Sequence, residues 1–202
     1  MARRVICGAL AAAAIVTIVI LGTGPAHAED GKLTFLTLSK QPGILELGAG
    51  EFALIDNPSG GRWAPSPEFN VDSVFAWDLV NFWGLMRVRP MIGAFVTTEE
   101  SAMGYLGLHG SIPIVHHFEI DPFGAVGRYS YGKGRDMGSE WLFHAGFTGY
   151  YVLDSGYRFG LTYAHESNGG RFPHEHPGCL CNPGANDIQV TLGIPFTKLL
   201  GY

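Results

Sequence analysis

Residues 187–196 read DIQVTLGIPF, and in this stretch large apolar side chains alternate with small or polar ones. Because successive side chains of a β-strand point to opposite faces, the alternation predicts a strand with two unlike faces. The apolar face would carry Ile188, Val190, Leu192, Ile194 and Phe196. The opposite face would carry Asp187, Gln189, Thr191 and Gly193.

The same period of two recurs along the chain before this stretch, broken by turn-forming residues. No segment after residue 28 shows a 3.6-residue apolar stripe over three turns. We therefore predict an all-β, eight-stranded antiparallel fold. The predicted strands are Ile44–Leu54, Phe69–Leu79, Gly84–Thr97, Ala102–Ile114, His117–Tyr131, Glu140–Leu153, Tyr157–Asn168 and Ala185–Phe196. The segment Glu29–Gln41 fits a plug, a short strand or a periplasmic tail, and the sequence leaves these open.

The amino terminus has the layout of a secretory signal peptide. Arg3 and Arg4 precede an apolar run that is shorter than the roughly 20 residues of a membrane span, and small residues follow. We expect residues 1–28 to be removed near Ala28 and residues 29–202 to form a single barrel domain. The net charge then changes from −5 to −7, because two arginines are lost. A chain this acidic is not expected to bind nucleic acid.

Two environments produce strands with one apolar and one polar face. A soluble antiparallel sheet keeps its polar face in water, whereas an outer-membrane barrel turns its apolar face to lipid. Aromatic side chains near strand ends, a small and mixed-polar opposite face, and the signal peptide favour the outer-membrane barrel. A secreted β-sandwich or lipocalin-like barrel remains the alternative.

Several charged side chains fall on the polar face and are therefore expected inside the barrel. Buried charges must pair or contact water, so we expect a structural network of ion pairs there rather than catalysis. The side chains are Arg87, Arg89, Glu119, Asp121, His144, Glu166 and Asp187.

His165 and Ser167 lie two residues apart in the seventh predicted strand, on the face that also carries Phe159, Leu161 and Tyr163. The spacing directs both side chains outward, near the end of the strand. Polar side chains that face lipid are costly, so they indicate a functional site. A serine beside a histidine base is the pair that nucleophilic ester hydrolysis uses. By spacing alone, a polar strand end at the headgroup level is the commoner explanation.

The stretch 165–170 (HESNGG), the turn 182–186 (NPGAN) and a last strand ending in 193–196 (GIPF) together resemble the lipid A 3-O-deacylases of the PagL type, also called acyloxyacyl hydrolases. The likeness is strongest over residues 157–196. It implies an outer-membrane barrel that hydrolyses the 3-position ester of lipid A in lipopolysaccharide, with no metal or other cofactor. By this resemblance Ser167 is the nucleophile, His165 the base and Asn168 the motif asparagine. The main-chain N–H groups of Gly169 and Gly170 fall where the family is thought to hold the oxyanion.

One position departs from the family. The best-known member has a glutamate on the last strand that orients the histidine, and alignment on Gly184 puts Asn186 there. Alternation also turns Asn186 outward and Asp187 inward. Asparagine can fix the imidazole tautomer by accepting a hydrogen bond, but it cannot stabilise the imidazolium by charge. We therefore predict a Ser-His-Asn site, with a local bulge that brings Asp187 round as the alternative.

The predicted loop before the last strand carries His174, His176, Cys179 and Cys181, all of which are possible zinc ligand types, but their spacing matches no established zinc site. A bond between Cys179 and Cys181 would close a small strained ring. Two other functions stay open: a non-catalytic outer-membrane barrel, structural or lipid-binding, whose site has decayed, and a soluble lipid-binding barrel. A homodimer is also left open.

Overall fold

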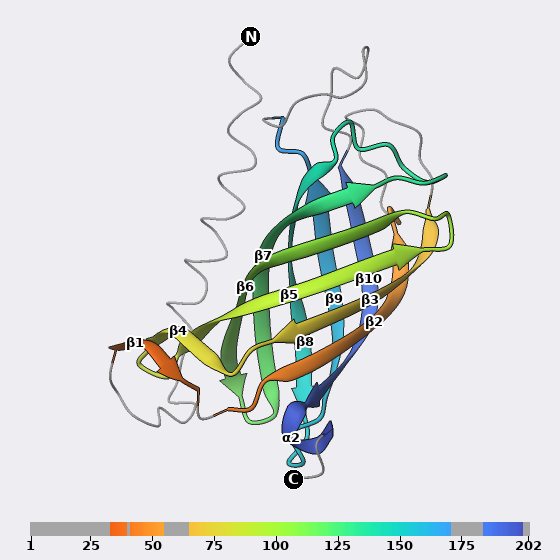
Figure 1. Cartoon of the computed structure of the whole chain (residues 1–202). Helices are drawn as coiled ribbons and strands as arrows, with labels where there is room; N and C mark the ends of the chain where they lie inside the picture. The colour runs from red at the N-terminus through yellow and green to blue at the C-terminus, as the bar shows by residue number, and fades with distance from the viewer. Residues whose placement is uncertain (1–32, 40, 55–64, 171–183, 200–202) are drawn as a thin grey trace, which may run out of the picture.

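The computed structural model describes residues 33–39, 41–54, 65–170 and 184–199, and these residues are almost entirely β-strand (Figure 1). The predicted signal segment 1–28 lies outside the described residues. No described helix is long and apolar enough to cross a membrane. The elements are β1 (Leu33–Leu38), β2 (Ile44–Phe52), β3 (Ser66–Val74), β4 (Trp77–Phe82), β5 (Met86–Thr97), β6 (Ala102–Val115), β7 (Phe118–Ser130), β8 (Trp141–Val152), β9 (Arg158–Ser167), β10 (Ala185–Pro195) and the short helix α2 (Phe196–Leu199).

Eight of these strands close into an antiparallel barrel. Their order around the ring is β2, β3, β5, β6, β7, β8, β9 and β10. The ring closes because β10 pairs with β2, and β5 pairs with both β3 and β6. The predicted all-β, eight-stranded antiparallel barrel is confirmed.

The second predicted strand, Phe69–Leu79, was wrong as one continuous element. It is split into β3 and β4 at residues 75–76, and both halves pair with β5. Val74 of β3 pairs with Met91 of β5, and Val80 of β4 pairs with Val88 of β5. Between these two pairs the chain advances six residues from β3 to β4 (80 − 74) but only three along β5 (91 − 88). Such an insertion bends a strand and shifts its register.

The short strand β1 occupies part of the segment whose structure the sequence left open. The pairing of β2 with β3 begins at Ile44 and Val74. Beyond that pair, β1 takes the place of β2 and pairs with β4, starting at Leu38 and Trp77. Figure 1 shows β1 and β4 together at the lower left, beside the start of β5. They form a two-stranded extension at one rim of the barrel.

Alternation separates the two faces of the barrel wall as predicted. Outward side chains include Phe69, Leu161 and Val190, each more than half exposed. The charged side chains predicted for the interior are buried or half-buried. They form ion pairs there: Arg158 Nη1 lies 2.7 Å from Glu119 Oε2 and 3.1 Å from Asp121 Oδ2.

The interior is less uniformly polar than the sequence predicted. Near the ends of their strands, Phe52, Phe95 and Tyr129 pack together inside the barrel, with ring centroids between 5.6 and 6.3 Å apart. Ile44 and Val74 are buried at the opposite end. Apolar side chains thus fill both ends of the interior, and a polar network lies between them.

The two ends of the barrel differ in the length of their connections. Residues 53–65, 131–140 and 168–184 connect strands at one end, whereas the other end has the short turns 116–117 and 153–157. In outer-membrane barrels the longer connections lie on the extracellular side. His165, Ser167 and Asn186 all belong to the end with the long connections.

Candidate active site at the ends of β9 and β10

His165 is the centre of an outward-facing group of polar side chains. In the sheet it lies directly opposite Asn186 of β10 on one side and Ala145 of β8 on the other. Ser167, the last residue of β9, lies opposite Phe143. His165, Ser167 and Asn186 are all half-buried on the outer face. The backbone register therefore brings the three predicted residues to one patch.

Asn186 contacts the predicted base directly. Its Oδ1 lies 2.8 Å from His165 Nδ1. Asp187 points the other way: it is fully buried, and its Oδ1 accepts a hydrogen bond of 2.8 Å from the backbone N–H of Ala53. The structure thus gives the outward position to Asn186 and the interior position to Asp187, with no bulge that exchanges them.

Tyr163 is a further member of the patch that we did not single out from the sequence. Its hydroxyl donates a hydrogen bond of 2.8 Å to the same oxygen of Asn186. The signal was present, because Tyr163 precedes His165 by two residues and so shares its face. Tyr163 also packs on Phe147, with ring centroids 5.9 Å apart. We infer that Tyr163 holds the Asn186 side chain in place.

The contact with Asn186 assigns separate roles to the two nitrogens of His165. A carbonyl oxygen only accepts a hydrogen bond, so Nδ1 carries the proton and donates a hydrogen bond to Asn186 Oδ1. Nε2 is then unprotonated and can act as a base. No hydrogen bond joins Ser167 to His165 among the described residues. Such bonds are often long in the absence of substrate and shorten in the reacting complex.

Asn168 is fully buried and ties the motif to a neighbouring connection. Its Nδ2 donates to the backbone oxygen of Met137 at 2.9 Å, and its Oδ1 accepts the N–H of Gly170 at 2.7 Å. Gly169 and Gly170 both have positive φ, 63° and 64°, a conformation that favours glycine. In this conformation the Gly170 N–H is already used by Asn168, whereas no hydrogen bond among the described residues uses the Gly169 N–H.

A polar pair lies inside the barrel behind the patch. His144 Nδ1 is 2.5 Å from Glu166 Oε1, and both side chains are buried. Because Glu166 directly follows His165 on β9, its side chain points to the opposite face of the wall. This pair therefore supports the strand from inside and does not contact the outer patch.

Three interior residues nearer the other end of the barrel have the side chains of a metal site. Glu46, His109 and Asp121 present ligand atoms within 4.8 Å of one another. The same carboxylates already accept hydrogen bonds, from Tyr150 at 2.9 Å and from Arg158 at 3.1 Å. This arrangement suits an internal network of ion pairs, as predicted for the barrel interior.

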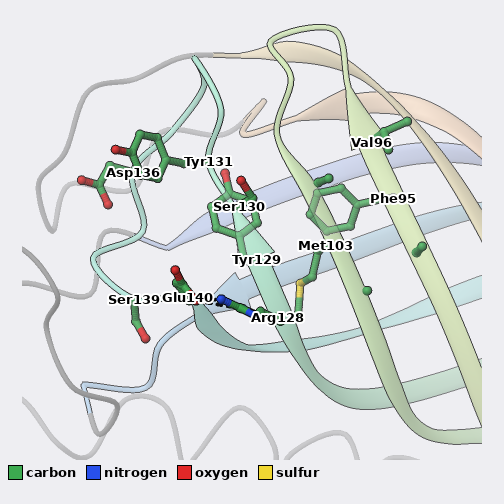
Figure 2. Close-up of a pocket in the computed structure, with 13 residues that line it drawn as sticks. Phe95, Val96, Met103, Arg128, Tyr129, Ser130, Tyr131, Asp136, Ser139 and Glu140 are labelled. Atoms are coloured by element: carbon green, nitrogen blue, oxygen red, sulfur yellow. Dashed lines mark hydrogen bonds and ion pairs between the residues drawn. The ribbon is translucent and has the colours of Figure 1, made fainter.

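A cavity of about 690 Å³ opens on the outer face of β5, β6 and β7, next to the connection 131–140 (Figure 2). Arg128 and Glu140 pair at its edge, at 2.8 Å from Nε and 2.5 Å from Nη2. The cavity does not include His165, Ser167 or Asn186. The predicted loop with His174, His176, Cys179 and Cys181 lies outside the described residues.

Comparisons with known proteins support the fold. No family model matches the chain, and no curated protein matches its sequence. Among solved structures, the outer membrane enzyme PagL superposes with a TM-score of 0.54 at 14% identity, covering 75% of this chain and 99% of that one. Neisserial surface protein A (NspA) gives a TM-score of 0.49 at 5% identity, covering 76% and 97%. At 14% identity the likeness to PagL shows the fold, an eight-stranded barrel of the outer-membrane type, and no more.

Proposed function

We propose that this protein is an outer-membrane lipid A 3-O-deacylase that uses Ser167 as its nucleophile and His165 as its base. The observation that carries the proposal is the hydrogen bond from His165 Nδ1 to Asn186, in a patch on the outer face of the barrel wall. An ester hydrolase whose substrate is a membrane lipid needs its nucleophile on that face. A binding barrel has no need of an oriented imidazole beside an outward serine.

The proposed reaction proceeds in two steps. Ser167 Oγ attacks the ester carbonyl carbon while His165 Nε2 takes the hydroxyl proton. When the carbon–oxygen bond of the ester breaks, His165 returns that proton to the sugar oxygen, and the acyl group stays on Ser167. Water, deprotonated by His165, then attacks the acyl-enzyme, and a 3-hydroxy fatty acid leaves as His165 returns this proton to Ser167 Oγ. Throughout, Asn186 keeps the imidazole in the tautomer that these proton transfers need.

The negative charge on the carbonyl oxygen needs donors close to Ser167. The Gly169 N–H follows Ser167 by two residues and suits this role, whereas Gly170 would have to release Asn168 first. Backbone donors of this kind act where charge develops in the transition state. Asn168 acts indirectly, by fixing the turn that carries both glycines.

A non-catalytic barrel with a decayed site is the second candidate, and one observation favours it. The residue that orients His165 is a neutral asparagine, which cannot compensate the charge of an imidazolium ion. The two candidates predict opposite results with lipopolysaccharide. They agree on the location in the outer membrane and on contact with lipid. Cleavage near Ala28 and a homodimer remain predictions for both.

The experiment is an assay of the refolded barrel with lipopolysaccharide, read by mass spectrometry. We expect wild-type protein to remove one 3-hydroxyacyl chain per lipid A and the Ser167→Ala variant to remove none. The Ser73→Ala variant is a matched control, because Ser73 lies on β3, away from the patch. Equal products from wild type and Ser167→Ala, or none from wild type, would reject the enzyme.

A further inference from the structure

The cavity on the outer face of β5, β6 and β7 has an apolar floor. The floor comes from the outward residues Ala94, Val96, Ala102 and Gly104. A Cβ atom added at Gly104 would meet nothing within 4 Å, so the space in front of this strand is open. Hydrocarbon is the chemistry that gains from contact with such a surface.

The rim of the same cavity is polar. Arg128 pairs with Glu140, and Asp136 and the hydroxyl side chains of Ser130, Tyr131 and Ser139 also lie on this side (Figure 2). One arginine and two carboxylates give the rim a formal charge of −1 (+1 − 2). A headgroup rich in hydroxyls suits this rim better than a phosphate, which two carboxylates would repel.

The connection that forms the rim is held to the barrel by several hydrogen bonds. Ser101 Oγ donates to the backbone oxygen of Tyr131 at 2.7 Å, and the Tyr129 hydroxyl donates to that of Arg135 at 2.8 Å. Asn168 Nδ2 donates to Met137 O in the same connection. The cavity is therefore preformed and does not depend on a ligand to shape it.

We propose that this cavity binds a lipid with a sugar headgroup, with one acyl chain on the floor and the headgroup at the rim. The polar rim lies at the end of the barrel with the long connections, which in outer-membrane barrels is the extracellular side, at the level of the outer-leaflet headgroups. The site uses neither Ser167 nor His165. The cavity is therefore a second lipid site, separate from the patch around His165. The proposal does not depend on whether that patch is an esterase.

Gly104 and Gly149 provide a matched pair for the test. A Cβ atom at either glycine would meet nothing within 4 Å, yet only Gly104 lines the cavity. Gly104→Trp should fill the cavity, whereas Gly149→Trp adds the same side chain to β8. Ala94→Trp fills the floor from β5 and replaces Gly104→Trp if that variant does not fold.

The experiment places the Ser167→Ala barrel in phospholipid vesicles with a photoactivatable alkyl glucoside. A second probe has the same diazirine-bearing chain but a phosphate headgroup. We expect the glucoside to cross-link mainly to residues 94–104 and 128–131. In Gly104→Trp this yield should fall about tenfold, which corresponds to about 1.4 kcal/mol of binding free energy, and in Gly149→Trp it should not change.

Three results would overturn the proposal. Cross-links spread evenly around the barrel would mean ordinary boundary lipid, and a stronger signal from the phosphate probe would reject the headgroup assignment. Equal loss in Gly104→Trp and Gly149→Trp would reject the cavity as the site. Because the Ser167→Ala background cannot form an acyl-enzyme, the result does not depend on the proposed hydrolysis.

Discussion

Replacing Asn186 by aspartate puts a negative charge beside His165 and keeps the oxygen that contacts it. Oδ1 lies 2.8 Å from His165 Nδ1, and the Tyr163 hydroxyl donates to the same oxygen, so a carboxylate of the same shape keeps both hydrogen bonds. Only the carboxylate can stabilise the imidazolium that forms when His165 takes the serine proton. If the proposed mechanism is right, Asn186→Asp should be faster than wild type.

The size of the effect follows from the hydrogen bond. A hydrogen bond to a charged partner contributes about 1.5–3 kcal/mol, against about 0.5–1.5 kcal/mol for a neutral pair. The difference, about 1–1.5 kcal/mol, corresponds to about a five- to twelvefold increase in kcat, since 1.36 kcal/mol is tenfold in rate. Release of 3-hydroxy fatty acid from lipopolysaccharide, followed by mass spectrometry, measures this ratio.

Asp187→Asn is the control for this prediction. It alters a buried carboxylate next in sequence, but it keeps an oxygen that can accept the Ala53 N–H. We expect it to leave kcat within about twofold of wild type, as for a change worth less than about 0.5 kcal/mol. Loss of turnover in Asp187→Asn, together with no gain in Asn186→Asp, would refute the role assigned to Asn186.

Three further substitutions test the surroundings of the site and the barrel interior. Tyr163→Phe removes one neutral hydrogen bond to Asn186 and should lower kcat about two- to tenfold without changing KM, as steady-state kinetics would show. Asn168→Ala removes the hydrogen bonds that the buried side chain makes to Met137 O and Gly170 N–H, and should cost about 1–3 kcal/mol of unfolding free energy in urea. Phe95→Ala should cost about 3–5 kcal/mol because the ring is buried inside the barrel, and its neighbour Val96, which is 51% exposed, should tolerate alanine.

The barrel could be predicted because one physical regularity determines it. The side-chain period of a strand is two, and a wall between two unlike environments sorts residues by that period, as in β9 and β10. The same rule put His165, Ser167 and Asn186 on one face. Alternation does not say which residues of neighbouring strands lie opposite each other. The structure supplied that register, which places His165 opposite Asn186.

The features that the sequence did not reveal are those that alternation does not encode. The split between β3 and β4 appears only in how each of them pairs with β5. The alternation of side chains continues through the split, so the sequence gives no sign of it. The apolar ends of the interior were missed because a polar lumen was assumed along its whole length. The use of the Gly170 N–H by Asn168 depends on the shape of one turn. Tyr163 shared the right face, but a tyrosine on an aromatic face is not distinctive.

The central claim is that Ser167 is activated by His165, and covalent labelling tests it most directly. An alkyl fluorophosphonate reacts with serines that a neighbouring base activates, and digestion with mass spectrometry identifies the labelled residue. We predict a single adduct on Ser167 in wild type and none in His165→Ala. Absence of the adduct in wild type, or equal labelling in His165→Ala, would contradict the account.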